Sequence, residues 1–227
     1  PFLMSLTHTW GSIVNKKAVE AAGDNYGMKP VGTGPFKLKT WAKGDRIVFE
    51  RNESYWGKKP AYKELVMRAV AEDTNRTIEL ESGAVDIAYR IPMIDMKRVE
   101  ENPKLKLLRK IENSTTYMGF NCSKPPFDNV KVRKAISLAL DTIGMQKAVF
   151  RGIGRAPNAA VAPNVLYSNK KIPAHVQDVE AAKKLLAEAG VKLPLKAQLW
   201  TNEYKPRRDL AQIIQSQLAD VGIEVEI

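Results

Sequence analysis

Residues 196–227 read KAQLWTNEYKPRRDLAQIIQSQLADVGIEVEI, and this stretch indicates the class of fold. KAQLWT at its start predicts a strand, and IEVEI at 223–227 predicts another because apolar and charged residues alternate. The residues between them predict a helix whose apolar face consists of Leu210, Ile213, Ile214, Leu218 and Val221. A strand, a helix and a strand in this order form a crossover unit, which needs a larger sheet to complete it.

Three helices are predicted in the stretch directly before the crossover unit, from residue 129 to residue 190. The stretch DVEAAKKLLAEAG at 178–190 ends at a glycine and buries Val179, Ala182, Leu185, Leu186 and Ala189. The stretch NVKVRKAISLALD at 129–141, capped by Asp128 or Asn129, has one apolar face made of Val132, Ile136, Ala139 and Leu140. Asp141 is expected to cap the third helix, which a loop rich in Gly and Pro follows at 152–173.

The first half of the chain alternates short strands with short helices. Strands are predicted at 36–41 and 45–52, paired as a hairpin across AKGD, and then at 64–71, 84–92, 104–111 and 114–121. Helices are predicted at 12–23, at 93–102 and at 73–83, the last with Asp73 or Thr74 as N-cap and Gly83 as its end. This order predicts an α/β fold with mixed α+β layers.

Composition and charge narrow the class of partner. The 227 residues are 44% hydrophobic, without a run of eighteen apolar residues that could span a membrane. The net charge of +11 suggests an anionic partner, and a basic nucleic-acid-binding module is one alternative. The lysine pairs are scattered among acidic residues and no basic stripe carries regularly spaced aromatics, which favours a solvated surface over nucleic acid as a partner.

The glycines of GTGP at 32–35 could belong to a phosphate-binding loop or to a turn. A phosphate loop needs a helix directly after it, whereas Pro35 leads into Phe36, Leu38 and Trp41, the apolar side of a strand. The turn is therefore the preferred interpretation.

No catalytic constellation is present in the sequence. His8 and His175 have no carboxylate or cysteine at ligand spacing, so each is expected to be a surface or packing residue. Cys122 is the single cysteine, which excludes an internal disulfide. We therefore expect a binding protein, not an enzyme, with no cofactor and no metal.

Four motifs, in order, resemble one protein family. They are GTGPFKLKTW, RNESYWGKKP, LESGAVDIA and GFNCSKPPFDNVKVRKAISLALD, with the AAKKLLAEAG helix following. Together they resemble the bacterial extracytoplasmic solute-binding proteins that deliver oligopeptides and dipeptides to ABC importers. In this family GTGP leads into a hairpin, and NESYWGKKP is the turn after its second strand, where Tyr55 and Trp56 pack, so both motifs are expected to be structural.

The resemblance implies a two-lobed periplasmic-binding-protein-like fold, present only in part. Family members are about twice as long, and the start without Met and the end in a strand suggest a fragment. Residues 1–115 would be part of the first lobe, residues 116–121 a crossing strand, and residues 122–227 the first half of the second lobe. Because the cut would leave the strand at 224–227 at an exposed edge, the fragment is expected to associate with a copy of itself.

The resemblance also implies the function. A peptide would bind between the lobes and pass to the permease subunits of an ABC importer, from a receptor free in the periplasm or held outside the membrane as a lipoprotein. Some family members bind nickel chelates, haem, glutathione or sugars on the same scaffold, and these ligands stay open as alternatives.

The resemblance places the ligand contacts on three stretches. On the crossing strand the expected contacts are Tyr117, Met118, Gly119 and Asn121. Arg90, just before Pro92, is also expected to lie near the ligand. Thr9 and Trp10 are expected contacts on weaker grounds. Packing or hinge structure is the alternative interpretation for each. The residues that usually anchor ligand charge lie largely in the later part of the second lobe.

Overall fold

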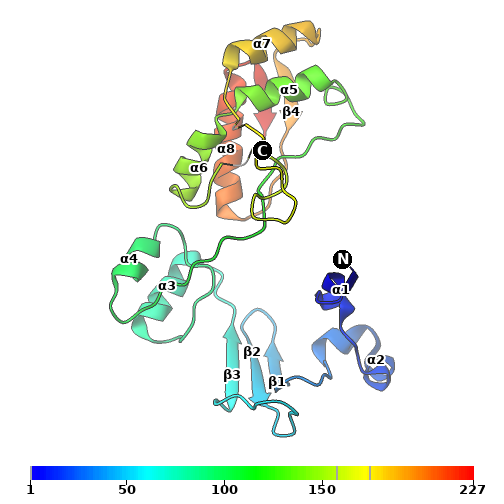
Figure 1. The fold of residues 1–227 in the computed structure, drawn as a ribbon, viewed down its shortest axis with the longest axis vertical. Helices are drawn as coiled ribbons and strands as arrows, with labels where there is room; N and C mark the ends of the chain where they lie inside the picture. The colour runs from blue at the N-terminus through cyan, green and yellow to red at the C-terminus, as the bar shows by residue number, and fades with distance from the viewer. Residues whose placement is uncertain (1, 157, 174) are drawn as a thin grey trace. The chain divides into compact units, whose positions relative to one another are not determined.

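The chain folds into two compact units, Pro1–Ile91 and Pro92–Ile227. The computed structural model describes residues 2–156, 158–173 and 175–227 (Figure 1). The division at 91/92 lies well before the lobe boundary expected after residue 115. The lobe assignment itself concerns a complete receptor and stays a prediction.

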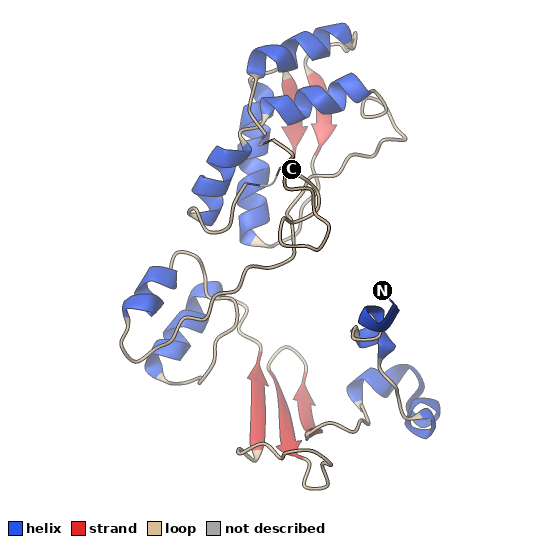
Figure 2. Ribbon diagram, viewed as in Figure 1, coloured by secondary structure: helices blue, strands red, loops and turns tan. Residues whose placement is uncertain are grey.

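The first unit is built around a three-stranded antiparallel sheet in the order β1-β2-β3 (Figure 2). Its elements are α1 (Phe2–Ser5), η1 (Thr9–Gly11), α2 (Lys16–Ala22), η2 (Gly23–Met28), β1 (Phe36–Ala42), β2 (Arg46–Arg51), β3 (Glu64–Arg68) and α3 (Asp73–Ser82). Strands β1 and β2 pair from Phe36 with Arg51 to Ala42 with Arg46, which confirms the predicted hairpin.

Asn52 joins the two turn motifs of this unit. Its side-chain amide donates to the Gly34 carbonyl at 3.0 Å, and its backbone N–H donates to the Pro35 carbonyl at 2.8 Å. Its side-chain oxygen accepts from the backbone N–H of Ser54 at 3.1 Å. The GTGP turn and the turn after β2 therefore hold each other, which supports a structural role. Trp56, however, is 81% exposed, and among the aromatic rings of the described residues it contacts only that of Tyr55, so the expected packing of Trp56 was wrong.

The second unit is built on a two-stranded parallel sheet, β4 (Leu195–Gln198) and β5 (Ile223–Glu226), joined by helix α8 (Lys205–Ala219). This is the predicted crossover unit, although β4 begins one residue earlier than the expected strand at 196–201 and ends three residues earlier than that strand does. Its other helices are α4 (Met96–Glu101), α5 (Val130–Ala139), α6 (Thr142–Phe150) and α7 (Val179–Glu188).

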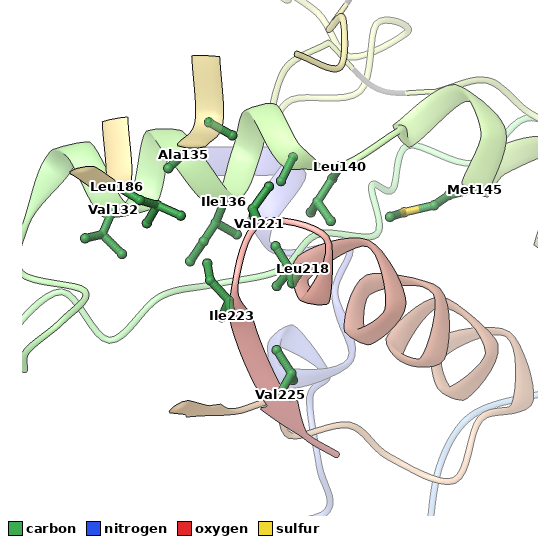
Figure 3. Packing of buried hydrophobic residues seen from close by; sticks show 12 residues of the cluster. Val132, Ala135, Ile136, Leu140, Met145, Leu186, Leu218, Val221, Ile223 and Val225 are labelled. Atoms are coloured by element: carbon green, nitrogen blue, oxygen red, sulfur yellow. The ribbon is translucent and has the colours of Figure 1, made fainter. Parts of the chain in front are cut away.

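The apolar core of the second unit gathers side chains from helices and sheet (Figure 3). Ile136 of α5, Leu186 of α7 and Ile223 of β5 are at most 2% exposed. Helix α5 packs on α7, and α8 packs on β5 and α6. The predicted apolar faces of α5, α7 and α8 are thus the faces that build the core.

Capping side chains begin three helices of the second unit, and the sequence predicted the caps of two of them, α5 and α6. Asn129 accepts from the Lys131 N–H at 2.9 Å, Asp141 from the Gly144 N–H at 2.8 Å, and Asp178 from the Ala181 N–H at 2.8 Å. In the first unit the expected cap of α3 was wrong by a residue. Glu72 occupies the N-cap without a capping hydrogen bond, while Asp73 lies in the first turn and contacts Arg76.

Three predicted strands, at 84–92, 104–111 and 114–121, do not form. A strand is stabilised by the neighbour that it pairs with, and no other strand pairs with these stretches in the part of the chain that the structure describes. At 84–92 the backbone also departs from extended geometry, because Arg90 has a positive φ of 61°. The apolar residues that suggested strands are exposed here, among them Ile87, Tyr89, Leu108 and Ile111.

Candidate ligand-binding site

The segment at 116–121 is anchored to the core through alternate residues, although it forms no paired strand. Met118 and Phe120 pack against the core of the second unit, and Phe120 lies 5.6 Å from the ring of Phe127. Tyr117, the residue before Met118, is 82% exposed. Its side chain is the large group that this segment offers to a partner.

The backbone of this segment has free hydrogen-bonding groups. Among the described residues, no backbone–backbone hydrogen bond involves residues 115–120. An extended, exposed chain with unpaired N–H and C=O groups can pair with another extended chain. Within the described chain, the backbone groups beside Tyr117 therefore have no backbone partner.

The other predicted residues of this segment differ in their surroundings. Gly119 is exposed, and a Cβ atom added there would lie 3.9 Å from the ring of Tyr117. Asn121 forms a turn with Ser123. Its side-chain oxygen accepts from the backbone N–H of Ser123 at 3.2 Å and from the hydroxyl of Ser123 at 2.7 Å. Met118 supports the segment from the core side.

Arg90 lies in the first unit, on the irregular stretch that follows α3. Its guanidinium lies 5.5 Å from the ring centroid of Tyr89. Its carbonyl accepts from Arg76, 3.2 Å away, and Arg76 also donates to the Val70 carbonyl at 3.0 Å. Arg76 therefore holds the backbone at Arg90 against the start of α3.

Thr9 and Trp10 belong to the short 3-10 turn η1 in the same unit. Trp10 is 75% exposed, and its ring stacks on His8 with 3.6 Å between centroids. His8 is thus an exposed residue that stacks on Trp10, in line with the expected surface or packing role. The predicted residues thus fall into two sets, with Thr9, Trp10 and Arg90 in the first unit and Tyr117 to Asn121 in the second.

Sequence reasoning missed the carboxyl end of β4. In open α/β sheets, ligands bind in the crevice outside the carboxyl ends of parallel strands. Trp200 follows β4 at this edge and is 88% exposed. Arg207, in the first turn of α8, lies 6.0 Å from the ring centroid of Tyr204. The strand-to-helix order was the available signal, but Trp200 was interpreted only as part of a strand.

Three pKa shifts occur on the sheet of the first unit and in the turn after β2. The hydrogen bond from Arg51 lowers the pKa of Glu53, and hydrogen bonds to Glu64 and Asp45 raise the pKa values of Lys39 and Arg46. All three groups are on the surface, where ion pairs explain their shifts. They therefore give no support to an acid–base site.

Other kinds of site find little support in the geometry. No cluster of His, Cys, Asp and Glu that could hold a metal ion occurs among the described residues. None of the described helices has the length and apolar character to span a membrane. A hollow of about 470 Å³ between α6 and α8 contains none of the predicted site residues and is lined by Ala148, Val149, Asp209, Gln212, Ile213, Ser216 and Gln217.

Known proteins resemble the chain over its whole length. The family profile described as bacterial extracellular solute-binding proteins, family 5 Middle, matches residues 1–227. The dipeptide-binding protein of Escherichia coli K12 is 30% identical over 237 aligned residues, with 100% of this chain and 44% of the relative covered. The glutathione-binding protein GsiB of the same strain is 29% identical, with the same shares covered.

A solved structure has the same fold. The periplasmic binding protein DppA of Helicobacter pylori, in complex with the peptide STSA, superposes with a TM-score of 0.87 at 28% identity. The alignment covers 100% of this chain and 45% of DppA. The chain thus spans less than half of the length of the relatives that it matches.

Proposed function

Because the chain belongs to family 5 of the bacterial extracellular solute-binding proteins, we propose that it forms part of a receptor that binds peptides for an ABC importer. The family is one of binding proteins, in keeping with the expectation of a receptor rather than an enzyme. The observation that carries the proposal is the segment at 115–120, which makes no backbone–backbone hydrogen bond among the described residues and on which Tyr117 is exposed.

The segment suits peptides because they share a main chain whatever their side chains are. Main-chain hydrogen bonds to residues 115–120 would hold an added strand, and the ring of Tyr117 would lie along it. Trp200 supplies a second exposed aromatic wall in the same unit. Arg90 and Arg207 are cations of the kind that pairs with a peptide carboxylate. Gly119 leaves room for the ligand to approach the backbone, and Met118 fixes the segment to the core.

Glutathione is the second candidate ligand. It contains amide groups and carboxylates, so the same backbone segment and cations could bind it, and GsiB supports it as a relative of similar identity. The receptor would act outside the cytoplasm, and the membrane subunits of the importer are its proposed partners. We propose either a free periplasmic form or a lipoprotein, which the leader sequence of the gene would distinguish.

Calorimetry on the complete receptor tests the proposal. Dipeptides to pentapeptides and glutathione would be titrated into the wild type and into the variants Tyr117→Ala and Trp200→Ala. Loss of an aromatic wall is expected to weaken binding by roughly tenfold, or about 1.4 kcal/mol. Tyr167→Ala, which removes a tyrosine that is 95% exposed elsewhere in the second unit, is the matched control. A receptor that binds neither ligand class, but binds a metal chelate or haem, would refute the peptide proposal.

Self-association is a further proposal for the chain on its own. Strand β5 pairs with β4 along one edge, and no other described strand pairs with its second edge. An open edge can pair with a copy of itself. Light scattering is expected to show a dimer, and a monomer at high concentration would refute this.

A further inference from the structure

Residues 142–177, from α6 to the start of α7, contain basic residues and no acidic one. The cations are Lys147, Arg151, Arg155, Lys170 and Lys171, and all 25 acidic residues of the chain lie outside this segment. Many basic residues outside this segment form surface ion pairs with acidic ones, such as Lys131 with Glu188. We call residues 142–177 the basic segment.

The charges of the basic segment face the solvent without compensation. All five cations are exposed. None of them takes part in an ion pair within the described parts of the chain. Their positive potential is therefore available to a partner outside the molecule.

Local hydrogen bonds fold the basic segment back on itself. Gln146 of α6 donates to the Ile153 carbonyl at 3.0 Å, and Asn158 donates to the carbonyl of Ile172. The second bond brings the stretch after Arg155 to the stretch after Lys171. The cations at the two ends of the loop thus belong to one local surface.

The turn of this loop carries exposed apolar groups. Leu166 is 77% exposed and Tyr167 is 95% exposed, and Tyr167 has a positive φ of 67°. The turn is held by Ser168, whose hydroxyl donates to the Pro163 carbonyl at 2.8 Å. An aromatic ring and a leucine next to Lys170 and Lys171 match an interface with both apolar and anionic parts.

We propose that the basic segment is a membrane-contact surface that binds anionic phospholipid headgroups. Cations near an anionic bilayer are attracted to it, and exposed tyrosine and leucine side chains insert at the headgroup level. A fluid bilayer needs no shape complementarity, which suits a loop that presents charges and two apolar side chains. Such contact would keep a receptor for a membrane importer close to the plane in which the importer lies.

Vesicle cosedimentation tests this proposal on the complete receptor, prepared without any lipid anchor. The wild type is expected to bind vesicles that contain phosphatidylglycerol, to ignore vesicles of pure phosphatidylcholine, and to lose binding as salt rises. The double variant Lys170→Glu/Lys171→Glu is expected to bind roughly tenfold more weakly or worse. Leu166→Ser/Tyr167→Ser removes the apolar pair without changing charge and is also expected to weaken binding.

Matched variants separate this surface from net charge and from peptide binding. Lys134→Glu/Lys192→Glu makes the same charge change at exposed lysines outside the basic segment, and it should bind vesicles nearly as the wild type does. Tyr117→Ala should leave vesicle binding unchanged, while the basic-segment variants should bind peptide normally. Peptide binding without vesicle binding by the wild type would overturn this inference and leave the proposed function intact. The inference would also be overturned if the two lysine double variants lost vesicle binding equally. It would be overturned as well if the basic-segment variants kept vesicle binding and lost only their binding to importer subunits in detergent.

Discussion

The two units of this chain are held together in different ways. Every apolar residue that is fully buried among the described residues lies in the second unit, from Val99 to Val225. In the first unit the buried side chains are Asn52 and Thr77, both polar. The second unit therefore depends on apolar packing, whereas the first depends on its strand ladder and on hydrogen bonds between turns.

The sheet of the first unit illustrates this contrast. Ile47, Val48 and Phe49 of β2 are each only half buried. The free energy gained from burial scales with the apolar area removed from water. Each of these side chains should thus contribute less to stability than a core residue of the second unit.

The largest expected effect comes from one substitution made in both units. Ile136→Ala removes a core side chain that is 2% exposed, and it should cost about 2–5 kcal/mol. Ile47→Ala removes the same atoms from a half-buried position and should cost clearly less. Amide hydrogen exchange, followed by mass spectrometry on peptides from each unit, reports both losses separately. Equal losses would mean that the units share one mode of stabilisation.

A smaller effect is expected where the first unit depends on a polar side chain. Asn52→Ala leaves the Gly34 carbonyl and the Ser54 N–H without their partner, at a cost of about 1–3 kcal/mol. Exchange should rise at 32–60 and stay unchanged in the second unit. Asn202→Ala is the control. The side-chain oxygen of Asn202 accepts a hydrogen bond from the Tyr204 N–H, and this bond is exposed, so water can replace it. A uniform rise in both units would contradict the prediction.

Helix caps provide a third test. Asp178→Ala removes the capping hydrogen bond of α7 and should cost about 1 kcal/mol. Glu72→Ala, at the N-cap of α3, should cost almost nothing because Glu72 makes no capping hydrogen bond. Urea unfolding curves of the two variants measure the difference. A larger loss in the α3 variant would show that its first turn depends on Glu72 in another way.

The smallest effect concerns acid. Since the hydrogen bond from Arg51 lowers the pKa of Glu53, this carboxylate stabilises the folded first unit above its ordinary pKa of 4.5. That contribution is lost as the pH falls through the lowered pKa. Exchange in the turn after β2 should therefore rise in acid, and Glu53→Gln should abolish this pH dependence. Persistence of the same acid response in the variant would assign it to another group.

The helices could be predicted because their information is local. In α5 and α7 the spacing of apolar residues marks the buried face, and Asn129 and Asp141 mark the first turns of α5 and α6. A helix makes its backbone hydrogen bonds within its own segment, so neighbouring residues suffice to predict it. The hairpin of β1 and β2 was predictable for the same reason, since its partner strand is close in sequence.

The unformed strands show where local information ends. Residues 84–92 and 104–111 contain the right residue types, but a strand needs a partner that its own sequence does not name. The candidate site shows the same limit. The family motifs pointed to Tyr117, yet only the packing of Met118 and Phe120 against the core indicates which side of the segment is open.

The amino-acid sequence by itself determined the helices of the second unit, the caps of α5 and α6, the hairpin, the crossover unit and the family. Tertiary structure alone decided the rest: that Asn52 ties the GTGP turn to the turn after β2, that residues 115–120 form no backbone–backbone hydrogen bond among the described residues, and that Trp200 is exposed at the end of β4. The physical reason is the distance along the chain over which each interaction acts. Helix periodicity and capping act within a few residues, whereas strand pairing, burial and exposure depend on residues brought together from far apart in the sequence.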